Sequence, residues 1–222
     1  MSTGSIWILM IVVMILGQIV QSMLQSRFEK YSRVPTNNRM TGAEIATKIL
    51  ADNGITDVKV TDHYNPQTKT VNLSEAVYNS NSVAAAAVAA HECGHVLQHA
   101  KGYLPLRLRT ALVPVVSFSS RIVQWVLLAG VILVSMFHSY PVLIAGVVLF
   151  ALTTLFSFVT LPVEINASHR AVNWLENAGI TNYETRPMAI DALKWAAYTY
   201  VIAAVGSLAT LLYYLSFLND RR

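Results

Sequence analysis

Apolar residues gather in four long stretches of the chain, separated by more polar segments. The first stretch, residues 6–24, lies within 26 residues that carry no charged side chain. About 20 consecutive apolar residues match the thickness of the hydrocarbon core of a bilayer. This stretch has neither the basic start nor the small-residue cleavage site of a signal peptide. The pattern therefore predicts an uncleaved transmembrane span at 6–24.

The longest uncharged stretch contains 42 residues and runs from Ile122 to Val163. The polar tetrapeptide His138-Ser139-Tyr140-Pro141 interrupts it and is typical of a tight turn. Two spans, at 122–137 and 142–161, fit this length. A fourth span is predicted at 195–217, where tyrosines near both ends suit the membrane interface. We expect a mainly α-helical, polytopic integral membrane protein with about four transmembrane helices.

The segments between the spans have the patterns of a small α+β region. Residues 40–54 have apolar positions at helical spacing, with Thr41 as N-cap and Gly54 as the stop, which predicts an amphipathic helix. Alternating residues at 58–63 and 68–73 flank a turn signal and predict a β-hairpin.

An alanine-rich segment follows, and it predicts a helix from about residue 82 to residue 100 after N-cap candidates at 80–82. No internal repeat or long linker divides the sequence. We therefore expect a single membrane-embedded domain over residues 1–222, with catalytic segments at about 40–110 and 162–193.

Composition agrees with a membrane location. The chain has 222 residues, of which 54% are hydrophobic and 13% charged, whereas an average soluble domain has roughly 25% charged residues. The net charge is +4, but the basic residues form no long run, so nucleic acid is not an expected partner. The single cysteine, Cys93, excludes an intrachain disulfide.

Basic residues predict the topology. One cluster follows the first span, one precedes the second, and one lies between the third and fourth spans. All three fall on one side of the membrane, which the positive-inside rule assigns to the cytoplasm. Both termini are then expected outside, an orientation against which Arg221 and Arg222 argue mildly.

The candidate chemistry lies in the alanine-rich helix, in the sequence His91-Glu92-Cys93-Gly94-His95. This is an H-E-x-x-H pattern, in which residues four apart share one face of a helix, so both imidazoles can reach one metal ion. Glu92 lies beside them, where a general base for metal-activated water is needed. The longer metzincin pattern is excluded because Gln98 and Lys101 occupy its glycine and last histidine positions.

A catalytic zinc site usually takes three protein ligands, so a third ligand is needed. The candidates are His63, His99, Glu164 and His169. His99 is eight residues from His91, about 12 Å along a helix axis, too far for three imidazoles to converge.

Glu164 is favoured because a hairpin of spans two and three returns it to the membrane face that carries the two histidines. A carboxylate so close to hydrocarbon is costly unless it is paired or bound to a metal. The alternative for Glu164 is an ion pair with Arg170.

Three segments of the sequence together carry a family resemblance. They are Thr61-Asp62-His63-Tyr64-Asn65-Pro66, Ala89-Ala90-His91-Glu92-Cys93-Gly94-His95-Val96-Leu97-Gln98 and Leu161-Pro162-Val163-Glu164-Ile165-Asn166-Ala167-Ser168. They resemble the YugP-type neutral zinc metallopeptidases of bacterial membranes, over about residues 27–195. The arrangement is also similar to the membrane gluzincins of the HtpX and CaaX prenyl protease type. In those, an aspartate occupies the position of Ser168.

The resemblance implies a zincin-like catalytic region at the cytoplasmic face of the bacterial inner membrane. It implies that His91, His95 and Glu164 bind one Zn²⁺ and that Glu92 is the catalytic acid and base. The function that follows is a zinc-dependent membrane endopeptidase, in which metal-activated water attacks a peptide bond of a protein or peptide substrate.

Other roles and other functions stay open on the sequence alone. The candidates for stabilising the oxyanion, or for contacting the ligands, are His63, Tyr64, Ser168 and His169. A non-catalytic metal-binding scaffold or a transporter-like protein is the alternative function, although Glu92 would then have no task. The apolar surface is compatible with a homo-oligomer or a membrane partner protein.

Overall fold

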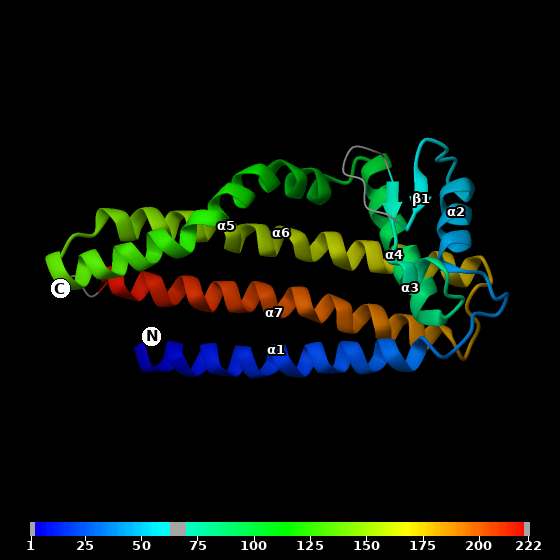
Figure 1. The fold of residues 1–222 in the computed structure, drawn as a ribbon, viewed down its shortest axis with the longest axis horizontal. Coiled ribbons are helices and arrows are strands. Elements are labelled where there is room, and N and C mark those ends of the chain that lie inside the picture. Colours follow the sequence, from blue (N-terminus) through cyan, green and yellow to red (C-terminus); the bar gives the residue numbers. More distant parts are fainter. Residues whose placement is uncertain (1–2, 63–69, 220–222) are drawn as a thin grey trace. The chain divides into compact units, whose positions relative to one another are not determined.

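The computed structural model describes residues 3–62 and 70–219 (Figure 1). These residues form seven helices and two short strands. In chain order they are α1 (Thr3–Tyr31), α2 (Gly42–Asp52), β1 (Lys59–Thr61), β2 (Thr70–Asn72), α3 (Glu75–Tyr78), α4 (Val83–Ala100), α5 (Leu104–Phe137), α6 (Pro141–Asn177) and α7 (Arg186–Asn219). The prediction of a mainly helical protein is confirmed.

Four of these helices, α1, α5, α6 and α7, are long and apolar enough to cross a membrane. They contain the four predicted spans, and α5 ends just before the predicted turn while α6 begins at its last residue, Pro141. Large apolar side chains on them are exposed, among them Ile8 at 65% and Trp125 at 69%. Such a surface needs an apolar environment to cover it. The helices also extend beyond the predicted spans, α6 by 16 residues at its C-terminal end.

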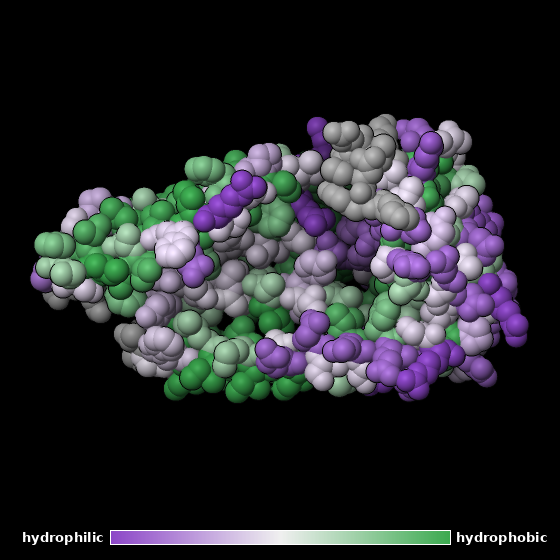
Figure 2. Space-filling view, viewed as in Figure 1, coloured by the Kyte–Doolittle hydropathy of each residue, from purple (hydrophilic) through white to green (hydrophobic). Residues whose placement is uncertain are grey.

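The chain divides into two compact units, each described here by itself. Unit 1 contains the described residues of Met1–Ile19, Leu104–Pro162 and Tyr200–Arg222. In it, α5 packs closely against α6 because glycine leaves room for backbone. A Cβ at Gly130 would lie 2.6 Å from the Cα of Leu143, and one at Gly146 would lie 2.9 Å from the Cδ2 of Leu127. Hydrophobic residues dominate its visible surface (Figure 2).

Unit 2 contains Val20–Tyr103 and Val163–Thr199 except for the undescribed residues 63–69. Its core gathers the buried faces of α2, α3 and α4, including the alanines of α4. The predicted N-caps are confirmed. The hydroxyl of Thr41 accepts from the backbone N–H of Glu44, whose carboxylate accepts from the N–H of Thr41. The hydroxyl of Ser82 accepts from the N–H of Ala85.

The predicted β-hairpin is wrong, because β1 and β2 pair in parallel. The register places Lys59 opposite Thr70 and Thr61 opposite Asn72. A turn signal in the sequence indicates that the chain changes direction, but it does not decide whether the two flanking strands pair antiparallel or parallel. Eight linking residues can span up to about 29 Å when extended, whereas a crossover past a three-residue strand has to cover only about 10 Å. The linker is therefore long enough to return the chain to the start of the first strand.

Candidate metal centre

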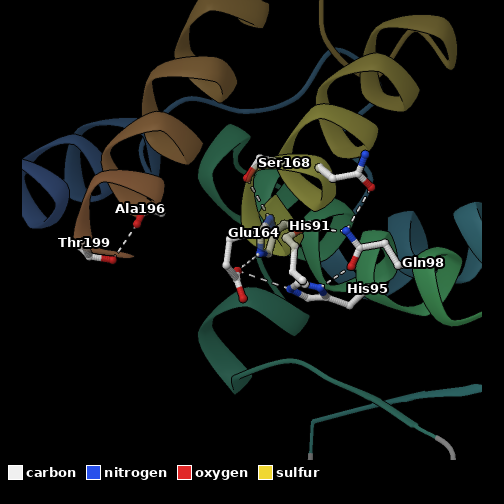
Figure 3. A network of polar contacts seen from close by, with 9 residues as sticks. His91, His95, Gln98, Glu164, Ser168, Ala196 and Thr199 are labelled. Atoms are coloured by element: carbon white, nitrogen blue, oxygen red, sulfur yellow. Dashed lines mark hydrogen bonds and ion pairs between the residues drawn. The ribbon is translucent and has the colours of Figure 1, made fainter. Parts of the chain in front are cut away.

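Two histidines of α4 and one glutamate of α6 converge in unit 2 (Figure 3). His91 and His95 lie one turn apart, with ring centroids separated by 4.8 Å and ring planes at 86°. The Oε2 atom of Glu164 lies 3.2 Å from Nε2 of His91 and 3.5 Å from Nε2 of His95. Ligand atoms of the three residues all lie within 4.8 Å of one another. One ion can therefore contact all three side chains.

The convergence depends on a close approach of two helix backbones. A Cβ at Gly94, which lies between the histidines, would stand 2.8 Å from the carbonyl oxygen of Ala167 and 3.1 Å from its Cα. Only glycine fits at that distance without a shift of one helix. Ala167, three residues after Glu164, is completely buried at this contact. Gly94 and Ala167 thus bring the carboxylate of α6 within reach of both imidazoles of α4.

The carboxylate is buried and the imidazoles are partly accessible. Glu164 is 2% exposed, whereas the side chains of His91 and His95 are 14% and 22% exposed. A buried carboxylate is costly unless it is paired or binds a metal. Burial lowers the pKa of His95, but hydrogen bonding to Glu164 and its charge, with contributions from Gln98 and Glu92, outweigh this and raise the pKa above its ordinary value.

Each histidine has a further polar contact at its other ring nitrogen. Nδ1 of His91 lies 3.1 Å from the hydroxyl of Ser168. Nδ1 of His95 lies 3.1 Å from Oε1 of Gln98. Both Nε2 atoms are then left to face Glu164. Metal-binding histidines commonly form such a contact, which orients the ring and sets its tautomer.

The remaining predicted residues lie in different places. Glu92 follows His91 on α4 and is half-buried. His99 and His169 are exposed, and neither belongs to the three-residue cluster. His63 and Tyr64 lie outside the described residues.

Arg170 and Cys93 contact groups outside the three-residue cluster. The Nε of Arg170 donates to Oδ1 of Asn166 at 2.7 Å. The thiol of Cys93 is buried and points to the backbone oxygen of Ala46 at 3.6 Å. Burial, with the charge of Glu92, raises the pKa of this thiol to about 12. A buried, protonated thiol is not the form of cysteine that binds metals.

Sequence reasoning missed the role of Gln98 and Asn166 beside the cluster. In the sequence Gln98 excludes a longer histidine motif, but it also lies three residues after His95 and so on the same helix face. That spacing was the available signal. Nothing in the sequence pattern indicated that Asn166 would meet Gln98, because the two residues are 68 positions apart.

A cavity of about 330 Å³ lies between α6 and α7. Ser168, which contacts His91, also lines this cavity. Five of the ten residues that line it are apolar, and they are Ile165, Val172, Ile190, Leu193 and Ala197. The cluster therefore has an apolar recess within reach of one of its own contact residues.

The three side chains fit zinc by the chemistry of their donor atoms. Two imidazole nitrogens and one carboxylate oxygen are a known ligand set of catalytic zinc, which keeps a further position for water. The Nδ1 contacts described above give each ring the orientation that such ligation needs. His91, His95 and Glu164 can thus hold a zinc ion while the two histidines keep their Nδ1 contacts.

Comparison with known proteins identifies the family. Residues 6–219 match the family described as "Putative neutral zinc metallopeptidase", and the chain belongs to this family. It is 41% identical over 209 residues to the "Putative membrane protease YugP" of Bacillus subtilis (strain 168), a match that covers 90% of this chain and 91% of that protein. No solved structure matches the chain. The resemblance seen in the sequence is confirmed, as is its assignment to the membrane zinc metallopeptidases.

Proposed function

We propose that this chain is a zinc-dependent membrane endopeptidase that binds one Zn²⁺ through His91, His95 and Glu164. The observation that carries the proposal is the convergence of three ligand atoms within 4.8 Å, with Glu92 adjacent on the same helix. Membership of a zinc metallopeptidase family supports both the metal and the reaction. The relative's name, a membrane protease, supports peptide-bond hydrolysis at a membrane.

The residues have distinct tasks in the proposed hydrolysis. A bound zinc ion supplies Lewis acidity, which lowers the pKa of water and favours negative charge on a carbonyl oxygen. Glu92 accepts a proton from the water that attacks the peptide carbon and then delivers it to the leaving amine nitrogen. Glu164 offers the negative charge that balances the metal. Ser168 and Gln98 hold the rings of His91 and His95.

The cavity between α6 and α7 is an argument for a peptide as the substrate. Its wall includes Ser168, whose hydroxyl lies 3.1 Å from Nδ1 of His91. It is large enough to take an apolar side chain of a peptide that lies across the site. We propose that protein or peptide chains bind there with an apolar residue near the scissile bond.

The proposed location is the bacterial inner membrane, with the site at its cytoplasmic face. The three clusters of basic residues beside the spans support this orientation through the positive-inside rule. The four membrane-length helices support a multi-pass protein. We further propose that the two compact units act as one membrane-embedded peptidase domain, because the site in unit 2 lies on a helix that begins in unit 1.

A non-catalytic metal scaffold would use the same three ligands, so Glu92 is the residue that separates the two functions. The test uses the full chain purified in detergent, with zinc content and casein hydrolysis measured on the same samples. We expect about one zinc per chain in both the wild type and Glu92→Gln, and hydrolysis in the wild type alone. General acid–base catalysis contributes about 10² to 10⁴-fold to rate.

The matched control is Glu75→Gln, which changes an exposed glutamate on α3. It should keep both zinc and hydrolysis. Equal hydrolysis by Glu92→Gln and the wild type would exclude Glu92 as the base. A wild type that holds zinc without hydrolysing casein or a panel of membrane-protein substrates would favour the scaffold.

A further inference from the structure

Gln98 is a completely buried polar residue at the contact of α4 with α6. A buried amide costs free energy unless its donors and acceptor are all satisfied. A leucine would fill the same space without that cost. The polar side chain therefore needs an explanation beyond packing.

The hydrogen bonds of Gln98 fix which way its amide points. Its Nε2 donates to the backbone oxygen of Val163 at 2.8 Å and to Oδ1 of Asn166 at 3.0 Å. The backbone oxygen can only accept, so the atom that faces it is the nitrogen. The amide oxygen Oε1 is then the atom that faces Nδ1 of His95.

Asn166 is held in turn by an arginine. The Nε of Arg170 donates to Oδ1 of Asn166 at 2.7 Å, the same oxygen that accepts from Gln98. A guanidinium group donates only and stays protonated in proteins. The donor at Arg170 therefore fixes the amide of Asn166, which in turn supports the amide orientation of Gln98.

We infer that Gln98, held by Asn166 and Arg170, is a positioning residue that sets the tautomer of His95. Both groups beside this ring accept, Oε1 of Gln98 at Nδ1 and the carboxylate of Glu164 at Nε2. When a metal ion takes the place at Nε2, the remaining ring proton is on Nδ1, where Oε1 of Gln98 accepts it. The lone pair of Nε2 is then directed to the side of Glu164, where a metal ligand is needed. This inference rests on the proposed function of the site but concerns a residue outside its three ligands.

His91 provides an internal comparison. Its Nδ1 contacts the hydroxyl of Ser168, which can both donate and accept. That contact orients the ring without deciding its tautomer. Gln98 therefore favours one tautomer of His95, whereas Ser168 only orients the ring of His91.

The first experiment measures the tautomer directly, by ¹⁵N NMR of the metal-free full chain labelled at histidine and kept alkaline enough for neutral imidazoles. All samples carry Glu164→Ala, which removes the competing acceptor at Nε2 of His95. We expect the Nδ1–H form of His95 in this background and a shift toward the Nε2–H form when Gln98→Met, which keeps the length but loses the amide, is added. Ser168→Ala is the control and should leave the signal of His95 unchanged. An unchanged tautomer in Gln98→Met would overturn the role of Gln98.

The second experiment measures zinc affinity by competition with a chromophoric chelator, with helix content checked by circular dichroism. Loss of a contact to a ligand typically weakens metal binding about 10 to 100-fold, which we expect for Gln98→Met. Asn166→Leu should weaken binding in the same direction. Asn166→Asp, which keeps an oxygen for both Gln98 and Arg170, should restore it.

The two variants Asn166→Leu and Asn166→Asp test the same network even where Gln98→Met fails to fold, since leucine and aspartate are close in size to asparagine. Equal zinc affinity in Asn166→Leu and Asn166→Asp would overturn the support given by Asn166. A wild type that binds no zinc would instead overturn the proposed function. The two failures are therefore distinguishable.

Discussion

The contact of α4 with α6 in unit 2 and the contact of α5 with α6 in unit 1 are both built around glycine. At Gly94 a Cβ would stand 2.8 Å from a backbone oxygen, and at Gly130 it would stand 2.7 Å from the backbone nitrogen of Leu143. The first contact encloses a carboxylate, two imidazoles and an amide. The second encloses the aliphatic side chains of Val123, Leu127, Leu143 and Val147.

The difference shows that a close helix contact at glycine can enclose either a polar site, as between α4 and α6, or an apolar core, as between α5 and α6. Small residues let helix backbones approach closely in either setting, as they commonly do in membrane proteins. Buried polar groups are tolerated only where they satisfy one another or bind a metal. The α4/α6 contact meets that condition through a network of side chains from both helices. Loss of close packing should therefore affect stability in both units but metal binding in unit 2 alone.

The largest effect on this comparison should come from removal of the buried carboxylate. Glu164→Ala leaves two imidazoles without their anionic partner, and we expect zinc affinity to fall roughly a hundredfold or more, with hydrolysis reduced to background. Elemental analysis and a casein assay on the same sample measure both. Glu176→Ala, on the same helix but exposed and paired with Arg186, is the matched control. Full zinc retention in Glu164→Ala would assign the third ligand to a histidine.

The next largest effect is expected when the glycine of each helix contact is replaced by alanine. Gly94→Ala and Gly130→Ala should each destabilise the protein by about 1–3 kcal/mol, the usual cost of overpacking, as measured by thermal unfolding in detergent. Only Gly94→Ala should weaken zinc binding, because it separates α4 from Glu164. Gly4→Ala, where a Cβ meets nothing within 4 Å, is the control. Similar losses of zinc affinity in both variants would contradict the distinction between the two contacts.

A smaller effect is expected at Ser168. Ser168→Ala removes the partner of Nδ1 of His91 and should weaken zinc binding about tenfold, the low end for contacts to a ligand. Ser120→Ala changes an exposed serine of α5 whose hydroxyl bonds to its own helix, at the backbone oxygen of Ser117. It should leave zinc affinity as in the wild type. No change in Ser168→Ala would show that the ring of His91 needs no support from α6.

The smallest effect should come from the cysteine inside the motif. The thiol of Cys93 points to Ala46 on α2 and not toward the ligand atoms. Cys93→Ala should therefore keep zinc content and hydrolysis within about threefold of the wild type, at a cost of about 1 kcal/mol for the lost volume. Loss of zinc in this variant would make Cys93 a ligand and contradict the present ligand set.

Much of the fold was predictable because the relevant signals are local. The spacing of His91 and His95, the N-caps Thr41 and Ser82 and the long apolar stretches all act within a few residues of where they appear. Glu164 was also found, because a charged residue at the end of 42 uncharged ones is conspicuous against a membrane background. The structure brings Glu164 to the histidines, while its role as a ligand stays a prediction.

The missed features depend on contacts between distant segments. The meeting of Gln98 with Asn166 depends on the register of α4 against α6, which no local pattern encodes. The parallel pairing of β1 with β2 depends on a register between the strands that no local pattern encodes. The helices run past the predicted spans because hydropathy reports only the apolar part of a helix, whereas α6 continues through polar residues to Asn177.

X-ray absorption at the zinc edge on the purified full chain tests the ligand set most directly. We expect nitrogen and oxygen neighbours at about 2.0–2.2 Å, with the outer-shell pattern of two imidazoles. The spectrum should stay the same in Glu92→Gln. A sulfur neighbour near about 2.3 Å, or a spectrum with the pattern of three imidazoles, would contradict a centre formed by His91, His95 and Glu164.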